Sequence, residues 1–285
     1  MSKVYIITGT STGFGRALAE AALEHGDKVV VTARKPEAVA ELVQKYPDTA
    51  LAVRLDVTND ADRQAVVSAA LEKFGRIDVL VNNAGRGSLG AAEEFSLEQL
   101  RDQMEVNFFG AAEMVRAVLP AMRRQRGGNI LNLTSIGGQV GYQGFAAYCA
   151  SKFALEGYSE SLRNEVSPLG IHVTIVEPGA FRTDFAGDSN MRAATEIDDY
   201  KPVIEPIRQY LYGNAGQQPG DPRKAAAAMI QAVESSDPPL RLILGADAYG
   251  LLAQKRAASD QELDAWRKIG EDTAIDGAEV RAVGG

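Results

Sequence analysis

The chain has 285 residues, 45% of them hydrophobic, which is enough to bury the core of one α/β domain of ordinary size. Its net charge of −8 and its isoelectric point of about 5.0 argue against nucleic acid or an anionic membrane surface as a partner. The only cysteine, Cys149, cannot form an internal disulfide, and no run of residues has the pattern of a secretory leader or the length of a membrane span. We therefore expect a cytoplasmic protein.

Short apolar runs alternate with amphipathic segments along most of the chain. The apolar runs, rich in β-branched residues, predict buried strands at 3–8, 28–32, 50–55, 77–81, 129–133, 171–176 and 240–244. The amphipathic segments predict helices at 16–26, 38–46, 60–75, 97–125 and 146–166. This alternation predicts an α/β fold in one domain, 1–285: a Rossmann-type doubly wound parallel sheet of about seven strands with helices on both faces.

Two segments depart from this alternation. Residues 186–220 contain scattered Gly, Pro, Asn and Asp, and we expect a long excursion with a little helix that covers the substrate. Residues 250–285 form a C-terminal extension, which we expect to be helical to about Trp266 and then polar, glycine-rich and loose.

The segment TGTSTGFG, residues 8–15, follows the first predicted strand and matches two chemical templates. One is the G-x-S-x-G elbow of a serine hydrolase, with Ser11 as nucleophile. Such a serine needs a histidine, but His25 lies about 18 Å further along the following helix, and His172 begins a strand at the opposite edge of the sheet. The hydrolase is therefore disfavoured. The shortage of His and Cys also excludes the usual zinc sites, so we expect no metal.

The other template is a phosphate cradle. A glycine-rich turn that opens a helix offers free N–H groups and the positive end of the helix dipole to a diphosphate. Gly13 and Gly15 permit close approach of the backbone, and Ser11 and Thr12 supply hydroxyl donors. A tight turn without any ligand is the alternative interpretation.

Further motifs follow at the ends of the predicted strands. They are Ala33-Arg34, Asp56-Val57, Asn82–Gly85 and Thr134-Ser135, followed by Tyr148 and Lys152. With Asn107 and Pro178-Gly179 in the expected order, the sequence resembles the short-chain dehydrogenase/reductase family, strongly over 3–183 and in outline beyond. The resemblance implies an oxidoreductase with a nicotinamide dinucleotide, and it implies that Asn107 holds a water that links Lys152 to solvent.

The chemistry of these residues agrees with that resemblance. Tyr148 and Lys152 lie one helical turn apart on the same side. An ammonium about 4 Å from a phenol, at an effective dielectric of 20, supplies about 4 kcal/mol, enough to lower the phenol pKa by about three units. Ser135 is expected to hold the substrate oxygen. The alternative is an ordinary amphipathic pair beside a strand-end hydroxyl, with Asn107 bonded to backbone.

The end of the second strand indicates the cofactor. It carries Arg34 instead of a carboxylate, and a guanidinium suits the 2′-phosphate of NADP(H), which we therefore expect in preference to NAD(H). The expected cofactor-binding residues are Gly9, Ser11, Thr12, Gly13, Phe14, Gly15, Arg34, Asp56, Val57, Asn83, Ala84, Gly85, Tyr148, Lys152, Pro178, Gly179, Phe181 and Thr183. The alternative role of the Asn82–Gly85 motif is to tie neighbouring strands together through its asparagine side chains.

Aromatic residues near the predicted site indicate the substrate. We expect a small molecule with a carbonyl or alcohol on an apolar body, bound by Ser135, Gln139, Tyr142, Phe145, Tyr148 and Phe185. The predicted function is NADPH-dependent reduction of a ketone or aldehyde, with Tyr148 as general acid/base. The alternatives are a non-catalytic NADP(H)-binding regulator and, less favoured, the hydrolase. The resemblance also suggests a homodimer or homotetramer joined through helices around 98–122 and 145–166.

Overall fold

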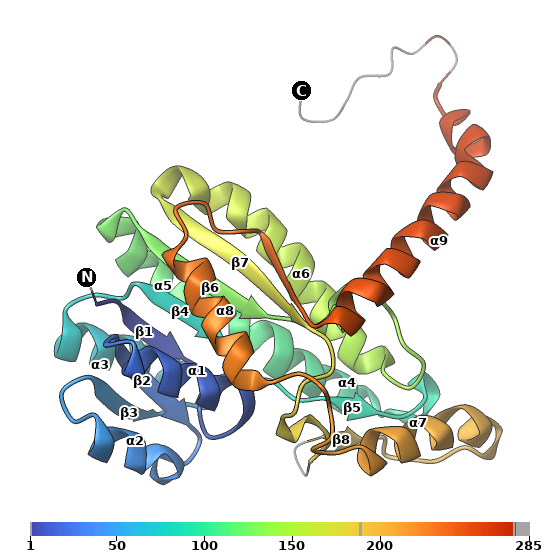
Figure 1. The fold of residues 1–285 in the computed structure, drawn as a ribbon. Helices are drawn as coiled ribbons and strands as arrows, with labels where there is room; N and C mark the ends of the chain where they lie inside the picture. The colour runs from blue at the N-terminus through green and yellow to red at the C-terminus, as the bar shows by residue number, and fades with distance from the viewer. Residues whose placement is uncertain (1, 188–189, 276, 278–285) are drawn as a thin grey trace.

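The computed structural model describes residues 2–187, 190–275 and 277 (Figure 1). Seven parallel strands form one sheet in the order β3-β2-β1-β4-β6-β7-β9. Their bounds are β1 Val4–Ile7, β2 Lys28–Ala33, β3 Ala50–Arg54, β4 Val79–Asn82, β6 Gly128–Leu133, β7 Ile171–Pro178 and β9 Arg241–Leu244. The doubly wound parallel sheet predicted from the sequence is confirmed, and each predicted strand lies within two residues of an observed one at either end.

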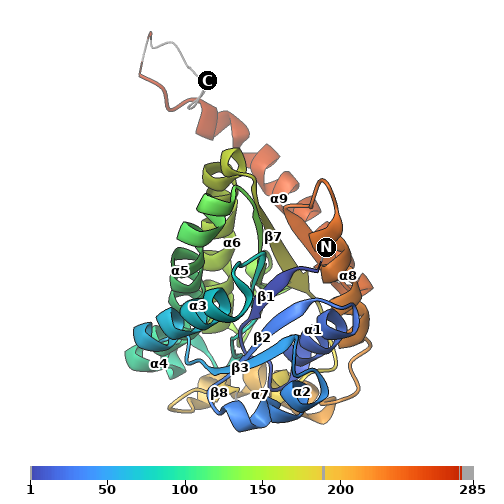
Figure 2. The same cartoon turned by 90° about the vertical axis from the view of Figure 1, so that its left-hand side faces the viewer.

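Nine α-helices lie within the described ranges. They are α1 Gly13–Glu24, α2 Ala40–Lys45, α3 Asp60–Phe74, α4 Leu97–Met104, α5 Gly110–Gln125, α6 Ala146–Val166, α7 Lys201–Gly213, α8 Pro222–Glu234 and α9 Ala246–Glu271. Helices α1 and α8 cover one face of the sheet, and α3, α5 and α6 cover the other (Figure 2). No described helix has both the length and the apolar character needed to cross a membrane.

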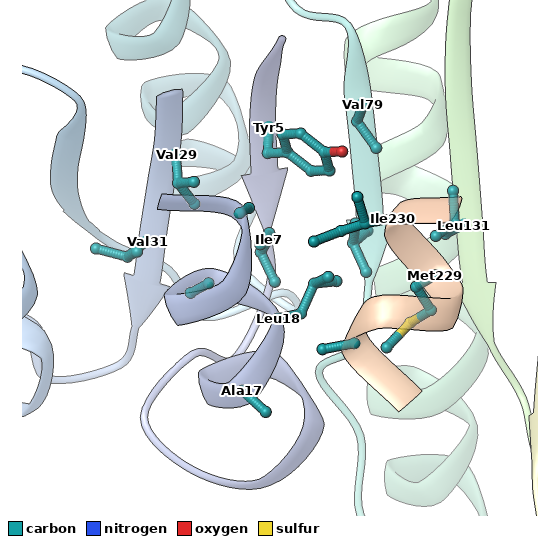
Figure 3. Close-up of a cluster of buried hydrophobic side chains, with 14 of the residues drawn as sticks. Tyr5, Ile7, Ala17, Leu18, Val29, Val31, Val79, Leu131, Met229 and Ile230 are labelled. Carbon is teal, nitrogen blue, oxygen red and sulfur yellow. The ribbon is translucent and has the colours of Figure 1, made fainter. Parts of the chain in front are cut away.

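Alternating side chains of β1 explain the two layers of core. Tyr5 and Ile7 point to the α1 and α8 side, where they pack with Leu18 and Ile230 (Figure 3). Ile6, between them in sequence, belongs to the other cluster, beneath α3, α5 and α6. All three are at most 1% exposed, because a central strand of a parallel sheet is covered on both faces.

The order of the strands fixes where a ligand can bind. The chain begins in the middle of the sheet at β1, moves outward to β3, and then returns to β4 on the other side of β1. The connections after β1 and β4 therefore diverge, which opens a crevice beyond the carboxyl ends of these two strands.

The helix predicted over 97–125 is interrupted. Between α4 and α5 the structure has a π-helical turn, Glu105–Phe109, with Asn107 at its centre. The prediction of a regular helix was wrong here because a repeat of 3.6 residues does not reveal one wider turn.

The segment predicted as an excursion is largely structured. Within it lie the short strand β8 (Met191–Arg192) and α7, and β8 pairs with β5 (Ser88–Leu89) in a separate parallel sheet. Residues 188–189 of the excursion lie outside the described residues. Helix α9 continues five residues beyond Trp266, to Glu271, and the predicted loose end at 276 and 278–285 also lies outside the described residues.

Candidate active site

The glycine turn after β1 leaves the start of α1 open. Gly9 and Gly13 have φ angles of +70° and +58°, which side chains other than glycine rarely adopt. Thr12 stands at the N-cap but makes no side-chain capping bond, and the first turn of α1 holds no acidic residue. The first N–H groups of α1 thus have neither a side-chain cap nor a neighbouring carboxylate from that turn, so they suit an anion. Ser11 and Thr12, the expected hydroxyl donors, are exposed there.

Gly15 is required by close packing. A Cβ at this position would lie 2.3 Å from the carbonyl oxygen of Gly9 and 2.4 Å from Nδ2 of Asn83. Asn83 donates to the carbonyl oxygens of Thr8 (2.8 Å) and Gly9 (2.9 Å). The Asn82–Gly85 motif therefore does tie the ends of β1 and β4 together, as the alternative interpretation proposed.

The same tie involves the hydroxyl of Thr8. It accepts hydrogen bonds from the backbone N–H groups of Asn83 (2.9 Å) and Ala84 (2.8 Å). Gly85 then passes close to the catalytic candidates, since a Cβ there would lie 3.2 Å from Oδ1 of Asn107 and 3.6 Å from Nζ of Lys152.

A cavity of about 320 Å³ lies at the start of α1. Gly13 and Thr183 line it, and a Cβ on Gly13 would lie 3.5 Å from Cβ of Thr183. Phe14 and Phe181, which neighbour lining residues in sequence, contact each other with ring centres 5.1 Å apart and planes inclined by 55°. An open helix N-terminus, a neighbouring cavity and glycines at the closest approaches together fit the diphosphate of a dinucleotide.

Arg34 and Asp56 are neighbours at the ends of β2 and β3. Arg34 is exposed, and no ion pair of its guanidinium occurs among the described residues. Burial alone would raise the pKa of Asp56, but hydrogen bonds from Thr58 and the charges of Arg34 and Arg54 hold it below its ordinary value. Val57, by contrast, packs into the core against Gly110, so its side chain is not free to flank a ligand on that side.

Ser135, Tyr148 and Lys152 converge at the carboxyl end of β6. The Ser135 hydroxyl accepts a hydrogen bond from the N–H of Gly137 (3.0 Å) and donates to the carbonyl oxygen of Pro178 (3.5 Å), and it lies near enough to Tyr148 to lower the pKa of that phenol. Lys152 Nζ lies 5.8 Å from the centre of the Tyr148 ring and donates to the carbonyl oxygen of Leu133 at 2.8 Å. A hydroxyl, a phenol and an ammonium therefore lie close together. An ordinary amphipathic Tyr–Lys pair on a helix would not need this arrangement.

The expected lowering of the Tyr148 pKa is not found in the chain by itself. Burial, the largest effect, raises the pKa of Tyr148, and the nearby Ser135 hydroxyl only partly opposes it. Burial also lowers the pKa of Lys152 to about 8, against the attraction of Glu156. The expectation was wrong because the phenol is as deeply buried as the ammonium, which binds the Leu133 carbonyl instead of the phenol oxygen.

Both the oxygen and the nitrogen of the Asn107 side-chain amide form hydrogen bonds within the protein. Oδ1 accepts from the N–H of Arg86, while Nδ2 donates to the carbonyl oxygen of Arg86 and to Oγ of Ser151, all at 3.0 Å. The side chain thus fixes the segment after β4 against α6. A water held at Asn107 would have to use the backbone of the π-helical turn.

Two of the predicted substrate residues surround Tyr148. The rings of Phe185 and Phe145 meet it edge-on, with centres 5.3 Å and 6.5 Å away. Gln139 and Tyr142 have other contacts: the Gln139 amide donates to the buried carboxylate of Glu177, and Tyr142 packs with the base of α9. Part of the predicted aromatic surface is therefore assembled, and Gln139 is directed to the acidic cluster described below.

Several residues that complete the site were missed by sequence reasoning. Gly87 must lack a side chain because Phe185 and Asn190 would lie within 2.7 Å of a Cβ there. Asp247, in the first turn of α9, accepts from the N–H of Ala180 at 2.7 Å and fills the space beside Gly179. A glycine next to Pro178 marks this turn in the sequence, but nothing in the sequence indicates that Asp247 supports it.

A buried acidic cluster lies behind the site. Arg241 contacts Glu156 at 3.1 Å, Glu177 at 3.1 Å and Glu160 at 2.9 Å. Glu156 also accepts from the hydroxyl of Thr134 at 2.6 Å. Glu177 is fully buried, and burial together with the charge of Glu156 raises its pKa to about 7. This cluster joins β9, β7 and α6 directly behind Ser135 and Lys152.

The alternative of a serine hydrolase finds no partner for Ser11. His25 lies at the far end of α1, where it contacts Asp27 (3.0 Å) and Glu234 (3.3 Å). His172 lies at the amino end of β7, opposite the site. Cys149 is buried, which raises its pKa, and its thiol contacts the carbonyl oxygen of Val140.

Comparison with known proteins gives a consistent result. The family model for short chain dehydrogenase matches residues 3–194. Oxidoreductase BOA17 of Botryotinia fuckeliana is 39% identical over 94% of this chain and 98% of its own, and a 3-ketodihydrosphingosine reductase of Bacteroides thetaiotaomicron is 39% identical over 90% and 92%.

Solved structures agree with this. A short-chain dehydrogenase from Streptomyces avermitilis is 47% identical, with a TM-score of 0.90 and coverage of 96% of this chain and 98% of its own. Two further short-chain dehydrogenases were solved with cofactors. One from Burkholderia cenocepacia, in complex with NADP, is 29% identical over 93% and 96% of the chains (TM-score 0.71). One from Burkholderia phymatum, in complex with NAD, is 26% identical over 98% of both (TM-score 0.79).

The raised pKa of Glu177 predicts a stability that falls with pH. The folded chain holds a proton on Glu177 up to about pH 7, whereas the unfolded chain loses it near 4.5, so the free energy of unfolding decreases as pH rises between these values. Glu177→Gln removes this decrease, worth up to about 3 kcal/mol for a shift of this size. We expect the free energy of unfolding of the variant, measured with urea, to rise relative to that of the wild type between pH 5 and pH 7.

Glu160→Gln is the matched control, because Glu160 contacts the same arginine but its side chain is 52% exposed. A Glu177→Gln difference that stays constant over this pH range would contradict the prediction.

Proposed function

The chain belongs to the short-chain dehydrogenase family, and from that premise we propose that it reversibly reduces a ketone or aldehyde to an alcohol with NADPH, acting on a CH–OH group in the reverse direction. One observation carries the proposal: a half-buried serine hydroxyl, a buried phenol and a buried ammonium converge at the sheet edge beside an open helix N-terminus. Each of the three has a different part in moving one proton.

Tyr148 is the proton donor in the proposed reduction. Because burial raises its pKa, the phenol is protonated at neutral pH, as an acid must be before it acts. The Ser135 hydroxyl, which lies beside this phenol, holds the same carbonyl oxygen and stabilises the charge that develops on it. A hydrogen-bond donor of this kind contributes about 3 kcal/mol in the transition state.

Lys152 stabilises the phenolate that the donated proton leaves behind. Unit charges about 6 Å apart interact by about 3 kcal/mol at an effective dielectric of 20. With a pKa of about 8 the ammonium is mostly charged at pH 7, and Glu156 helps to keep it so. We assign Asn107 a positioning part: its side chain fixes Arg86 and Ser151 around the lysine, and its backbone would hold the relay water.

A bound NADP(H) supplies the hydride. The start of α1, with Gly9, Gly13 and Gly15, would hold the diphosphate, and Arg34 would hold the 2′-phosphate. The remaining contacts are assigned by family resemblance: Asp56, Val57 and Asn83–Gly85 on the adenosine side, Lys152 at the ribose, and Pro178, Gly179, Phe181 and Thr183 around the nicotinamide. At Val57 the backbone is a better candidate for this contact than the side chain, because the side chain is in the core.

An apolar carbonyl compound is the proposed substrate. Phe145 and Phe185 flank the Tyr148 ring, and the excursion that begins directly after Phe185 is tied to the segment after β4 by the pairing of β8 with β5. The name of the Bacteroides relative, a 3-ketodihydrosphingosine reductase, is compatible with a ketone on a long apolar body.

Turnover of a carbonyl panel tests the substrate class. Ketones and aldehydes graded from small and polar to bulky and apolar are incubated with NADPH, and its oxidation is followed by absorbance. We expect kcat/KM to rise with apolar bulk, because aromatic rings line the approach to Tyr148. The reverse ranking would discard an apolar substrate. Tight NADPH binding without oxidation by any compound would favour the non-catalytic regulator.

Replacing Tyr148 tests the acid. Tyr148→Phe removes the proton and keeps the ring, so we expect kcat to fall by about 10²–10⁴ while the affinity for NADPH, measured by fluorescence titration, stays within about twofold. Tyr210→Phe is the control, since Tyr210 lies on α7 and is 73% exposed. Full activity in Tyr148→Phe would rule out the mechanism.

Replacing Arg34 tests the choice of cofactor. Loss of a charge-assisted hydrogen bond costs about 1.5–3 kcal/mol, so Arg34→Ala should lower kcat/KM for NADPH by about 10–100-fold. The value for NADH, which has no 2′-phosphate, should change little and is the internal control. Arg116→Ala, at a 70% exposed side chain on α5, should affect neither. A wild-type preference for NADH would contradict the assignment.

A further inference from the structure

Helix α9 extends away from the rest of the molecule. Figures 1 and 2 show it leaving the end of β9 and continuing beyond the helices that flank the sheet. Of its 26 residues only Ala248 and Leu252 are buried, and residues 253–271 are exposed apart from a half-buried Ser259. At 1.5 Å per residue this exposed part is about 28 Å long. Most of the stability of a helix in a protein comes from packing of one of its faces, and within the single chain residues 253–271 have almost no such packing.

The exposed part carries an apolar stripe. Leu263, Trp266 and Ile269 are 64%, 64% and 63% exposed, and a spacing of three residues places them within an arc of about 120°. The same side of the helix packs on the body at its base, through Ala248 and Leu252. That side of the helix is therefore covered at the base and uncovered further along, and between Leu252 and the stripe it carries Lys255, Ser259 and Glu262.

The charges on the helix are ordered in a way that suits pairing with itself. Lys255 and Arg256 come first, the small residues 257–259 follow, and Asp260, Glu262 and Asp264 come next. Among the described residues no ion pair involves Lys255, Arg256 or Glu262. When two copies of one helix pair antiparallel about a two-fold axis, each flank faces the same flank of its partner. The basic end then lies opposite the partner's acidic end.

Lys255 and Glu262 share one side of the helix, within the arc of the stripe, because they are seven residues apart. An antiparallel pair centred between residues 258 and 259 therefore brings each Lys255 beside the Glu262 of the partner subunit. In the same register Leu263 and Trp266 reach the base of the partner's α9, where Tyr249 is 59% exposed. Small residues at the crossing allow the two helices to approach closely.

The balance of charge argues against a lipid surface as the partner. Residues 253–271 contain four basic and four acidic side chains, whereas helices that lie on anionic membranes have an excess of Lys and Arg. The whole chain, at −8, would also be repelled. The basic pair at 255–256 and the acidic block at 260–264, which precede Arg267 and Lys268, instead match a second copy of the same helix.

We propose that α9 is an assembly arm by which two copies of this chain clasp each other, antiparallel, with the apolar stripe of each arm packed into the corner between the partner's α9 and its body. This surface is separate from the helices around 98–122 and 145–166 that the family resemblance suggests for assembly. The proposal does not depend on the reaction assigned above, and it stands or falls without any activity assay.

Trp266 is the only tryptophan in the chain, so its fluorescence reports directly on the proposed contact. We expect the molar mass from light scattering to rise with protein concentration to at least a dimer. The tryptophan emission should shift to shorter wavelength over the same concentrations, because association buries a side chain that is 64% exposed in the single chain. A monomer at all concentrations, or assembly without an emission shift, would overturn the proposal.

Charge exchange tests the register. Lys255→Glu should at least halve the assembled mass at a fixed concentration, since it faces Glu262 of the partner subunit with a like charge. Combining it with Glu262→Lys should restore the wild-type mass. Leu263→Ser with Trp266→Ser and Ile269→Ser should halve the mass by removing the stripe, and Tyr210→Ser, an exposed position on α7, is the control.

Three results would overturn the proposed pairing: unchanged mass in the triple serine variant, no rescue by the charge exchange, or Trp266-dependent sedimentation with anionic phospholipid vesicles. The last would identify a membrane surface as the partner instead. Circular dichroism of each variant, compared with the wild type, distinguishes loss of assembly from loss of the helix.

Discussion

A buried ammonium is the constraint on which the site depends. Lys152 is 6% exposed, and a charged group in such a place is costly unless protein atoms replace water around it. The carbonyl oxygen of Leu133 accepts one of its hydrogen bonds, and Glu156, one turn further along α6, favours its charged form. Both partners are in place only while α6 keeps its register on β6. The fold thus fixes where this charge lies, and Glu156 partly opposes the lowering of the Lys152 pKa by burial.

The residues that support Glu156 extend outward to the edge of the sheet. Glu156 is itself buried and shares Arg241 with Glu177 and Glu160. Arg241 begins β9, at the edge of the sheet furthest from β3. Three residues after that strand, Asp247 holds the turn that follows Pro178. Strands that contribute no predicted catalytic residue therefore determine where Ser135 and Lys152 lie, and the acidic cluster belongs to the site although it touches no reacting atom.

Much of this could be read from the sequence, for specific physical reasons. Buried parallel strands are short and apolar, and glycines stand where a backbone must approach another group, so the sheet and the turn around Gly13 and Gly15 were predictable. Side chains that act in pairs over long separations were not. Asp247 and Ala180 are far apart in the chain, as are Arg241 and Glu156, and each looks like an ordinary surface residue in sequence. The direction of the Tyr148 pKa was also missed, because spacing shows that a lysine is near but not how deeply both groups are buried.

Different interactions position the residues in the first and last parts of the chain. This difference affects how substrate specificity and assembly could vary. Up to about Thr183, small residues and hydrogen bonds to backbone fix positions to within a fraction of an ångström, as the clash of a Cβ at Gly15 shows. Beyond it, apolar ring contacts, which tolerate substitution better than hydrogen bonds do, surround Phe185, while the pairing of β8 with β5 ties the following segment to the residues after β4. Helix α9 joins the two regimes: its first turn bonds to the turn after Pro178, while its far end presents an apolar stripe to solvent. Because a helix is stiff over this length, a partner that steadied the far end of α9 would also steady Asp247, and with it the backbone beside the proposed nicotinamide site. Assembly and chemistry would then share one element, although no residue of the stripe touches the site itself.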